Sequence, residues 1–129
     1  MKDEIKAFQN KAQKFLKTAK LSLDNGDYDT TVSRVYYAMF FMAKAVLITK
    51  NIKAKTHSGV ISAFGQYFVK NNIFPKYLGK NLNNAFDIRL IGDYEILEDI
   101  EKNQAEELLK EGKEFVRKIE EYLEKNKFL

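Results

Sequence analysis

The sequence contains no cysteine, no tryptophan, one histidine and one proline among 129 residues. Without cysteine the chain cannot form disulfides, thiolate zinc sites, iron–sulfur clusters or a cysteine nucleophile. A single histidine excludes two-histidine metal motifs, and it excludes mechanisms that use one histidine as base and another as acid. Much enzyme chemistry is therefore ruled out, and we predict neither a bound metal nor a cofactor.

Long uncharged runs are also missing. No uncharged stretch approaches the length of about 18 residues that a membrane span needs. The N-terminal segment begins MKDE and lacks the apolar core of a signal peptide. We therefore expect a cytoplasmic protein with no membrane partner.

The size and charge of the chain fit one globular domain over residues 1–129, with 45% apolar and 31% charged residues. The net charge of +4 is unevenly spread. Residues 1–20 carry six lysines against two acids, residues 51–80 carry five lysines against none, and residues 98–129 carry seven bases against ten acids. This asymmetry permits a polyanionic partner without requiring one.

Apolar residues recur at steps of three and four along the chain, and strand-type alternation is absent. The pattern predicts helices at about residues 5–24, 27–50, 56–71, 75–92 and 99–125. The second is apolar around most of its circumference, so we expect it to be the most buried. We predict an all-α fold: an antiparallel up-and-down four-helix bundle with an additional short helix.

Local signals set the expected helix ends. Gly26 fits the left-handed position after the first helix, and Asp27 fits the N-cap of the second. Thr56 is the expected N-cap of the third helix. Pro75 fits the first turn of the fourth, which we expect to break near Gly92.

Arg89 is the clearest break in the apolar pattern. It follows Leu82 and Ala85 on one helical stripe, where a buried cation needs a carboxylate or an anionic ligand. One interpretation is an ion pair with Asp93 at i,i+4 that fixes the helix end. The other is a ligand-binding or catalytic arginine.

His57 lies at the start of the third predicted helix, in the segment KAKTHSG of residues 53–59. Lys55, His57 and the free backbone N–H groups of a helix start could together receive an anion, and the histidine could move a proton. The alternative is a histidine that is simply packed and hydrogen-bonded. The segment lacks the spacing of a phosphate-binding loop.

The second helix carries a further aromatic and basic face. Arg34, Tyr37, Phe41 and Lys44 adjoin its main apolar stripe. They could bind a nucleobase and a phosphate, or they could pack against another helix or a second copy of the chain. Because the apolar surface exceeds what one bundle seam needs, we expect a homodimer. The lysines of residues 1–20 are read as a solvated face.

Three segments resemble one known family. RVYYAMF at residues 34–40, HSGV at 57–60 and RLIGDY at 89–94 are similar to segments of the small stand-alone HEPN proteins of archaea and bacteria, a name that stands for higher eukaryotes and prokaryotes nucleotide-binding. The resemblance implies a dimeric four-helix bundle similar to the helical domain of kanamycin nucleotidyltransferase. It also implies a minimal nucleotidyltransferase as partner, often in a toxin–antitoxin pair.

The resemblance also bears on catalysis. Several HEPN branches are metal-independent endoribonucleases that use an arginine and a histidine four to six residues apart. Arg89 matches the arginine, but Tyr94, Glu95 and Ile96 occupy the positions available to the histidine. A tyrosine with a pKa of about 10 is a poor base at pH 7.

The resemblance and this departure lead to three hypotheses. The first is a HEPN module that binds a nucleotide or RNA, in which Arg89 holds phosphate, Asp93 orients the arginine and a tyrosine stacks on a base; Tyr37, Tyr94, Arg34, His57 and Lys55 complete the candidate site. The second is a ribonuclease whose acid–base pair is Arg89 with His57 or Tyr94. The third is a dimerising protein–protein adaptor without nucleic-acid binding.

Overall fold

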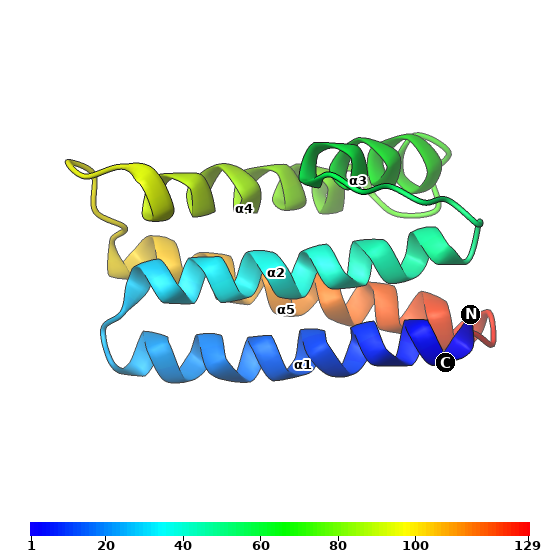
Figure 1. Ribbon diagram of the computed structural model, residues 1–129, viewed down its shortest axis with the longest axis horizontal. Coiled ribbons are helices and arrows are strands. Elements are labelled where there is room, and N and C mark those ends of the chain that lie inside the picture. Colours follow the sequence, from blue (N-terminus) through cyan, green and yellow to red (C-terminus); the bar gives the residue numbers. More distant parts are fainter.

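The computed structural model describes residues 1–129, and every regular element in it is helical. The elements are α1 (Lys2–Asp24), α2 (Tyr28–Ile48), α3 (His57–Phe64), the π-helical turn η1 (Gly65–Val69), α4 (Lys76–Tyr94) and α5 (Lys102–Lys125). The four long helices run up and down as antiparallel neighbours, α3 lies over one end of α4, and the two termini lie together (Figure 1). The predicted all-α bundle with an added short helix is confirmed.

The core is organised around α2, which contacts α1, α3, α4 and α5. Twelve of its 21 residues are buried, more than in any other helix, as its all-round apolar pattern predicts. By length and composition alone α2 could cross a membrane, yet 67% of its apolar stretch is buried inside the protein. The apolarity of α2 is therefore accounted for by the core of the bundle.

Several predicted helix ends are confirmed. Gly26 has the left-handed backbone (φ 75°) that lets the chain turn between α1 and α2. The side chain of Asp27 accepts a hydrogen bond from the N–H of Thr30, and Thr56 Oγ1 accepts one from the N–H of Gly59 at 3.0 Å. Both N-caps satisfy backbone donors that the first helical turn leaves free.

Other boundaries were predicted wrongly. Pro75 precedes α4 in an extended conformation instead of occupying its first turn, and α4 continues through Gly92 to Tyr94. An internal glycine weakens a helix by about 1 kcal/mol but does not end it when packing supports the next turn. The third helix changes to the π-helical turn η1 at Gly65, and α5 begins at Lys102 because Glu101 forms a capping box with Gln104.

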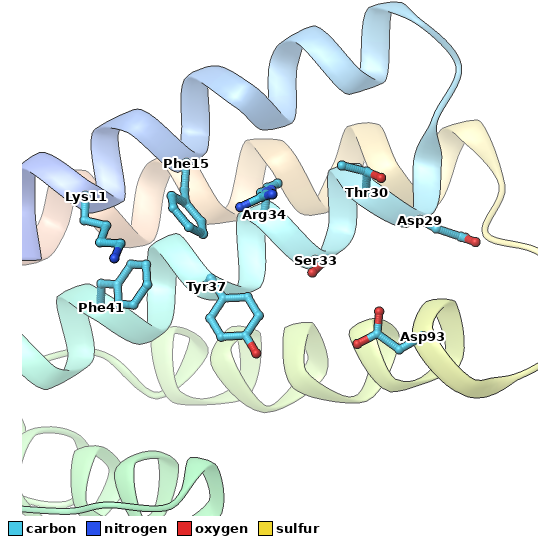
Figure 2. A pocket seen from close by; sticks show the side chains of 9 residues that line it. All are labelled: Lys11, Phe15, Asp29, Thr30, Ser33, Arg34, Tyr37, Phe41 and Asp93. Carbon is cyan, nitrogen blue, oxygen red and sulfur yellow. The ribbon is translucent and has the colours of Figure 1, made fainter.

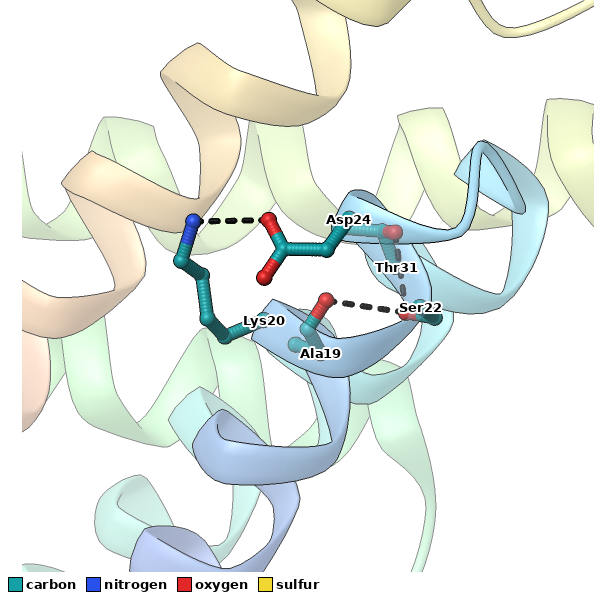
Figure 3. A network of polar contacts seen from close by, with 5 residues as sticks. All are labelled: Ala19, Lys20, Ser22, Asp24 and Thr31. Carbon is teal, nitrogen blue, oxygen red and sulfur yellow. Dashed lines mark hydrogen bonds and ion pairs between the residues drawn. The ribbon is translucent and has the colours of Figure 1, made fainter.

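The hairpin of α1 and α2 is joined by two buried hydroxyl groups (Figure 3). Ser22 Oγ and Thr31 Oγ1 lie 2.9 Å apart, and each also contacts a backbone carbonyl of its own helix. Buried polar groups are costly unless they are paired. This pairing allows Thr31, which is fully buried, to lie in the core of the bundle.

α5 packs tightly against α2 at Gly112. A Cβ atom at this position would collide with Cγ1 of Val35 and lie 3.6 Å from Sδ of Met39. Val35 and Met39 are themselves fully buried, so neither side chain can move into solvent.

We therefore expect Gly112→Ala to lower the free energy of unfolding by about 1–3 kcal/mol, the usual cost of overpacking a core. Gly65→Ala is the matched control, because Gly65 has helical angles (φ −60°) and open space around its Cα. That variant should keep or gain stability, by about 0.4–1 kcal/mol. Urea denaturation followed by circular dichroism measures both, and equal stabilities would contradict the close contact of α2 and α5.

Candidate functional site

Arg89 lies near the end of α4, on the side that faces α2. Its Cζ atom is 5.0 Å from the ring centre of Tyr37 and 5.6 Å from that of Tyr36. The side chain is only 14% exposed. A guanidinium in contact with two aromatic rings gains cation–π energy that partly offsets its loss of water.

The predicted ion pair of Arg89 and Asp93 is present, but it uses little of the guanidinium. Nε lies 2.9 Å from Asp93 Oδ2. Its N–H bond is not aimed at this oxygen, so the buried Nε makes no hydrogen bond. The two terminal nitrogens also donate no hydrogen bond within the protein, and unlike Nε they reach solvent. Arg89 is thus a largely buried cation whose five N–H groups donate no hydrogen bond within the protein.

His57, at the start of α3, contacts the same two tyrosines. Its ring centre is 5.6 Å from that of Tyr36 and 5.8 Å from that of Tyr37. It also packs on Phe40 at 4.6 Å and on Phe86 at 6.0 Å. The packed interpretation of His57 is therefore correct, and the fold also brings this residue to the tyrosine pair that Arg89 contacts.

The hydrogen bond between Tyr36 and His57 fixes which ring nitrogen is available. Tyr36 Oη lies 2.6 Å from His57 Nδ1. Burial raises the pKa of the Tyr36 phenol, which keeps its proton, and no other acceptor is within its reach. The phenol therefore donates to Nδ1, and the neutral imidazole carries its proton on Nε2.

Burial, and then the positive charges of Arg89 and Lys44, lower the pKa of His57 below 6.5. The imidazole is therefore neutral at pH 7. Its Nε2–H is a hydrogen-bond donor, so this nitrogen cannot accept a proton in that tautomer. The arrangement suits contact with an anion better than general-base catalysis.

A cavity of about 490 Å³ opens between α1, α2 and α4 beside this cluster (Figure 2). It is lined by Lys11, Phe15, Asp29, Thr30, Ser33, Arg34, Tyr37, Phe41 and Asp93. In Figure 2 the hydroxyl of Tyr37 points toward α4, and Asp93 lies on α4 opposite Ser33. The cavity therefore joins the predicted residues Arg34, Tyr37 and Asp93 in one place.

The cavity has ends of opposite charge. Lys11 and Arg34 lie at one end, with the guanidinium of Arg34 4.7 Å from the ring centre of Phe15. Asp29 and Asp93 lie at the other (Figure 2). Partial desolvation, and then the charges of Asp27, Asp99 and Asp93, raise the pKa of Asp29.

Some residues of this cavity were not predicted from sequence. In the sequence, Asp29 is a typical acidic residue of a first helical turn, and Thr30 and Ser33 are typical polar residues of a helix surface. The end of α4 places Asp93 opposite all three. Lys11 belongs to the lysine series that we interpreted as solvated, and only the pairing of α1 with α2 brings it to Phe41, 5.6 Å from the ring centre.

Other predicted residues lie outside the cluster. Tyr94 is 70% exposed and contacts no other aromatic ring, and Lys55 is exposed in the loop before α3 without a hydrogen bond or ion pair. Glu95 and Ile96 are exposed as well, and none of the positions 94–96 carries an imidazole. Phe41 packs on Phe15 of α1 at 5.2 Å, which confirms the packing interpretation of that part of α2.

The chain belongs to the HEPN domain family, whose model matches residues 5–122. It is 38% identical over 122 residues to the candidate toxin MJ0142 of Methanocaldococcus jannaschii, covering 95% of this chain and 83% of that protein. A second candidate toxin of the same organism, MJ0605, is 36% identical over 95% of this chain and 91% of its own length. A UPF0332 protein of Thermotoga maritima is 35% identical, with 93% and 91% covered.

The pKa of His57 tests the geometry of the cluster. This residue is the sole histidine, so proton NMR follows one imidazole signal through a pH titration. We expect a pKa below 6.5 that rises in Arg89→Met, because a nearby positive charge is removed. Lys14→Met, on the exposed side of α1, should leave it unchanged. An unchanged pKa in Arg89→Met would contradict the shared cluster.

The same shift has a consequence for stability. Because the pKa of His57 is lower in the folded protein than in the unfolded chain, the unfolded chain binds the proton more tightly. The contribution of His57 to stability is present above pH 6.5, and it falls as the pH drops from 6.5 toward the lowered pKa of the folded protein.

Proposed function

We propose that this HEPN protein binds a nucleotide or RNA phosphate at Arg89. The observation that carries the proposal is a buried guanidinium, bounded by Tyr36, Tyr37 and Asp93, whose N–H donors have no hydrogen-bond partner in the protein. Its terminal N–H donors reach solvent and are free to bind a ligand, and phosphate matches the planar fork of arginine. An arginine that only fixed the helix end would donate its N–H groups in hydrogen bonds to the neighbouring carboxylate of Asp93.

The neighbouring cavity offers partners for the rest of a nucleotide. Arg34 and Lys11 supply further positive charge, Tyr37 supplies an aromatic ring, and the carboxylates of Asp29 and Asp93 accept hydrogen bonds from ribose hydroxyls. His57 adds an Nε2–H donor rather than a base, which favours binding over cleavage.

The proposed protein partners are supported by the family resemblance and by one exposed segment. Ile96 and Leu97, directly after α4, are 92% and 96% exposed, and Tyr94 is 70% exposed. Apolar side chains grouped in this way favour a protein contact. We propose a homodimer that acts in the cytoplasm with a minimal nucleotidyltransferase, in a toxin–antitoxin type of system, in line with the toxin names of the two archaeal relatives.

Isothermal titration with adenosine 5′-monophosphate tests the binding site. Charge-assisted hydrogen bonds contribute about 1.5–3 kcal/mol each, so Arg89→Ala should weaken binding about 10- to 150-fold. Arg117→Ala is the matched control, because Arg117 forms an i,i+4 ion pair with Glu121 on an exposed face of α5. It should bind as the wild type does. Equal binding by both variants, or no binding by the wild type, would refute the proposed site.

A metal-independent ribonuclease is the second candidate, favoured by the contact of Arg89 and His57 with the same two tyrosines. Mixed-sequence RNA incubated with the protein in EDTA decides between the two. The binding proposal predicts intact RNA, because His57 offers a donor and positions 94–96 carry no imidazole. Cleavage that disappears in an Arg89→Ala variant of equal helical content would establish the ribonuclease instead.

A further inference from the structure

A second concave surface lies between α3–η1 and α4, away from the cavity beside Tyr37. Two cavities of about 580 and 490 Å³ share Gly65, Lys70, Asn83 and Asp87 and so form one groove. We call it the α3–α4 groove. Its other lining residues are Ser58, Ile61, Ser62, Gln66, Val69, Lys76, Gly79, Lys80, Asn84 and Phe86.

The groove is basic and rich in uncharged polar groups. Lys70, Lys76 and Lys80 are exposed and none of them forms an ion pair. The segment of residues 51–80 contributes no acid at all, and Asp87 is the sole acid of the lining. Amide and hydroxyl side chains make up most of the remaining polar lining. Such a surface attracts an anion that is long and hydrated.

The spacing along α4 suits a chain of phosphates. Lys76, Lys80 and Asn83 follow one another at i, i+4 and i+7, so they form one stripe that faces the groove. The step of four residues from Lys76 to Lys80 rises about 6 Å along the helix, similar to the separation of adjacent phosphates in an extended strand. Of the two glycines that line the groove, Gly65 has open space around its Cα, whereas Gly79 packs against the side chain of Val69.

One end of the groove reaches the cluster around Arg89. Ser58 directly follows His57, and the ring of Phe86 stacks on the His57 ring at 6.0 Å. A strand bound in the groove would therefore lead toward the proposed phosphate site.

We infer that the α3–α4 groove binds the sugar–phosphate backbone of single-stranded RNA that extends from the Arg89 site. The inference rests on the proposed function for the direction of the strand. The lining favours RNA over an acidic protein segment, because it offers few apolar anchors and many hydrogen-bond donors and acceptors. Phe86 is the single aromatic lining residue, so the groove has little with which to read bases.

Fluorescence anisotropy with a labelled 12-nucleotide mixed-sequence RNA tests the groove. The test variant changes Lys70, Lys76 and Lys80 together to serine. The control changes Lys2, Lys14 and Lys17 of α1 to serine, three exposed lysines without ion pairs. Each triple variant lowers the net charge from +4 to +1, since three of the positive charges are removed.

The groove variant should bind the RNA about 10- to 100-fold more weakly at 0.1 M salt, and its salt slope should fall by about 2, because each single-strand phosphate contact contributes about 0.7. The control triple variant should bind nearly as the wild type does. Affinity for adenosine 5′-monophosphate should stay unchanged in the groove variant, because a single nucleotide occupies only the Arg89 site.

Equal losses of RNA affinity in the two triple variants would overturn the inference, since the effect would then be one of net charge. The inference would also be overturned if poly-glutamate bound as tightly as RNA and lost affinity in the same groove variant. That result would indicate an acidic protein segment as the ligand of the groove. Loss of RNA binding in the groove variant, in a protein that does not bind adenosine 5′-monophosphate, would support the groove and refute the Arg89 site. RNA affinity that is unchanged in the groove variant, together with normal binding of adenosine 5′-monophosphate, would support the Arg89 site and refute the groove.

Discussion

The burial of α2 is the constraint on which the rest of the structure depends. This helix contacts all the other α-helices, so nearly every side chain it carries must pack or find a polar partner. Thr31 pairs with Ser22 of α1, and the phenol of Tyr36 donates to His57 of α3. The two polar contacts fix neighbouring helices to α2, and the second also decides the tautomer of the sole histidine.

Arg89 differs from these buried polar groups, because it has no hydrogen-bond partner within the protein. It points from α4 toward the most buried helix, yet its carboxylate partner leaves its donors unused. Natural cores keep such a cation where it has a use, because a buried charge with incomplete pairing lowers stability. Tyr36 and Tyr37 contact the guanidinium with their rings, and its terminal nitrogens reach solvent.

The fold was largely predictable because the apolar spacing is regular and the caps are ordinary. Asp27 and Thr56 could be assigned as N-caps from their residue type and position alone. The π-helical turn at Gly65 and the continuation of α4 through Gly92 could not, because tertiary packing decides whether a glycine ends a helix. Arg89 was identifiable as a polar residue on an apolar stripe.

The partners of Arg89 were less predictable. The contact of Arg89 and His57 with one tyrosine pair depends on how α3 and α4 cross α2, which no local pattern encodes. Asp29 and Lys11 likewise look like ordinary surface charges in the sequence, and only the packing of α1, α2 and α4 places them around one cavity. Tyr94, by contrast, is part of the RLIGDY segment that resembles the family, but its side chain is 70% exposed.

The free energy of unfolding of Arg89→Met, compared with the wild type in urea without nucleotide, tests the central claim most directly. If Arg89 is kept for a ligand, removing it takes away a poorly paired buried cation and leaves Asp93, which is 31% exposed, able to be hydrated. The account therefore predicts unchanged or increased stability. A loss of about 3–5 kcal/mol, as expected when a buried ion pair that supports the fold is broken, would contradict it and make Arg89 a structural residue.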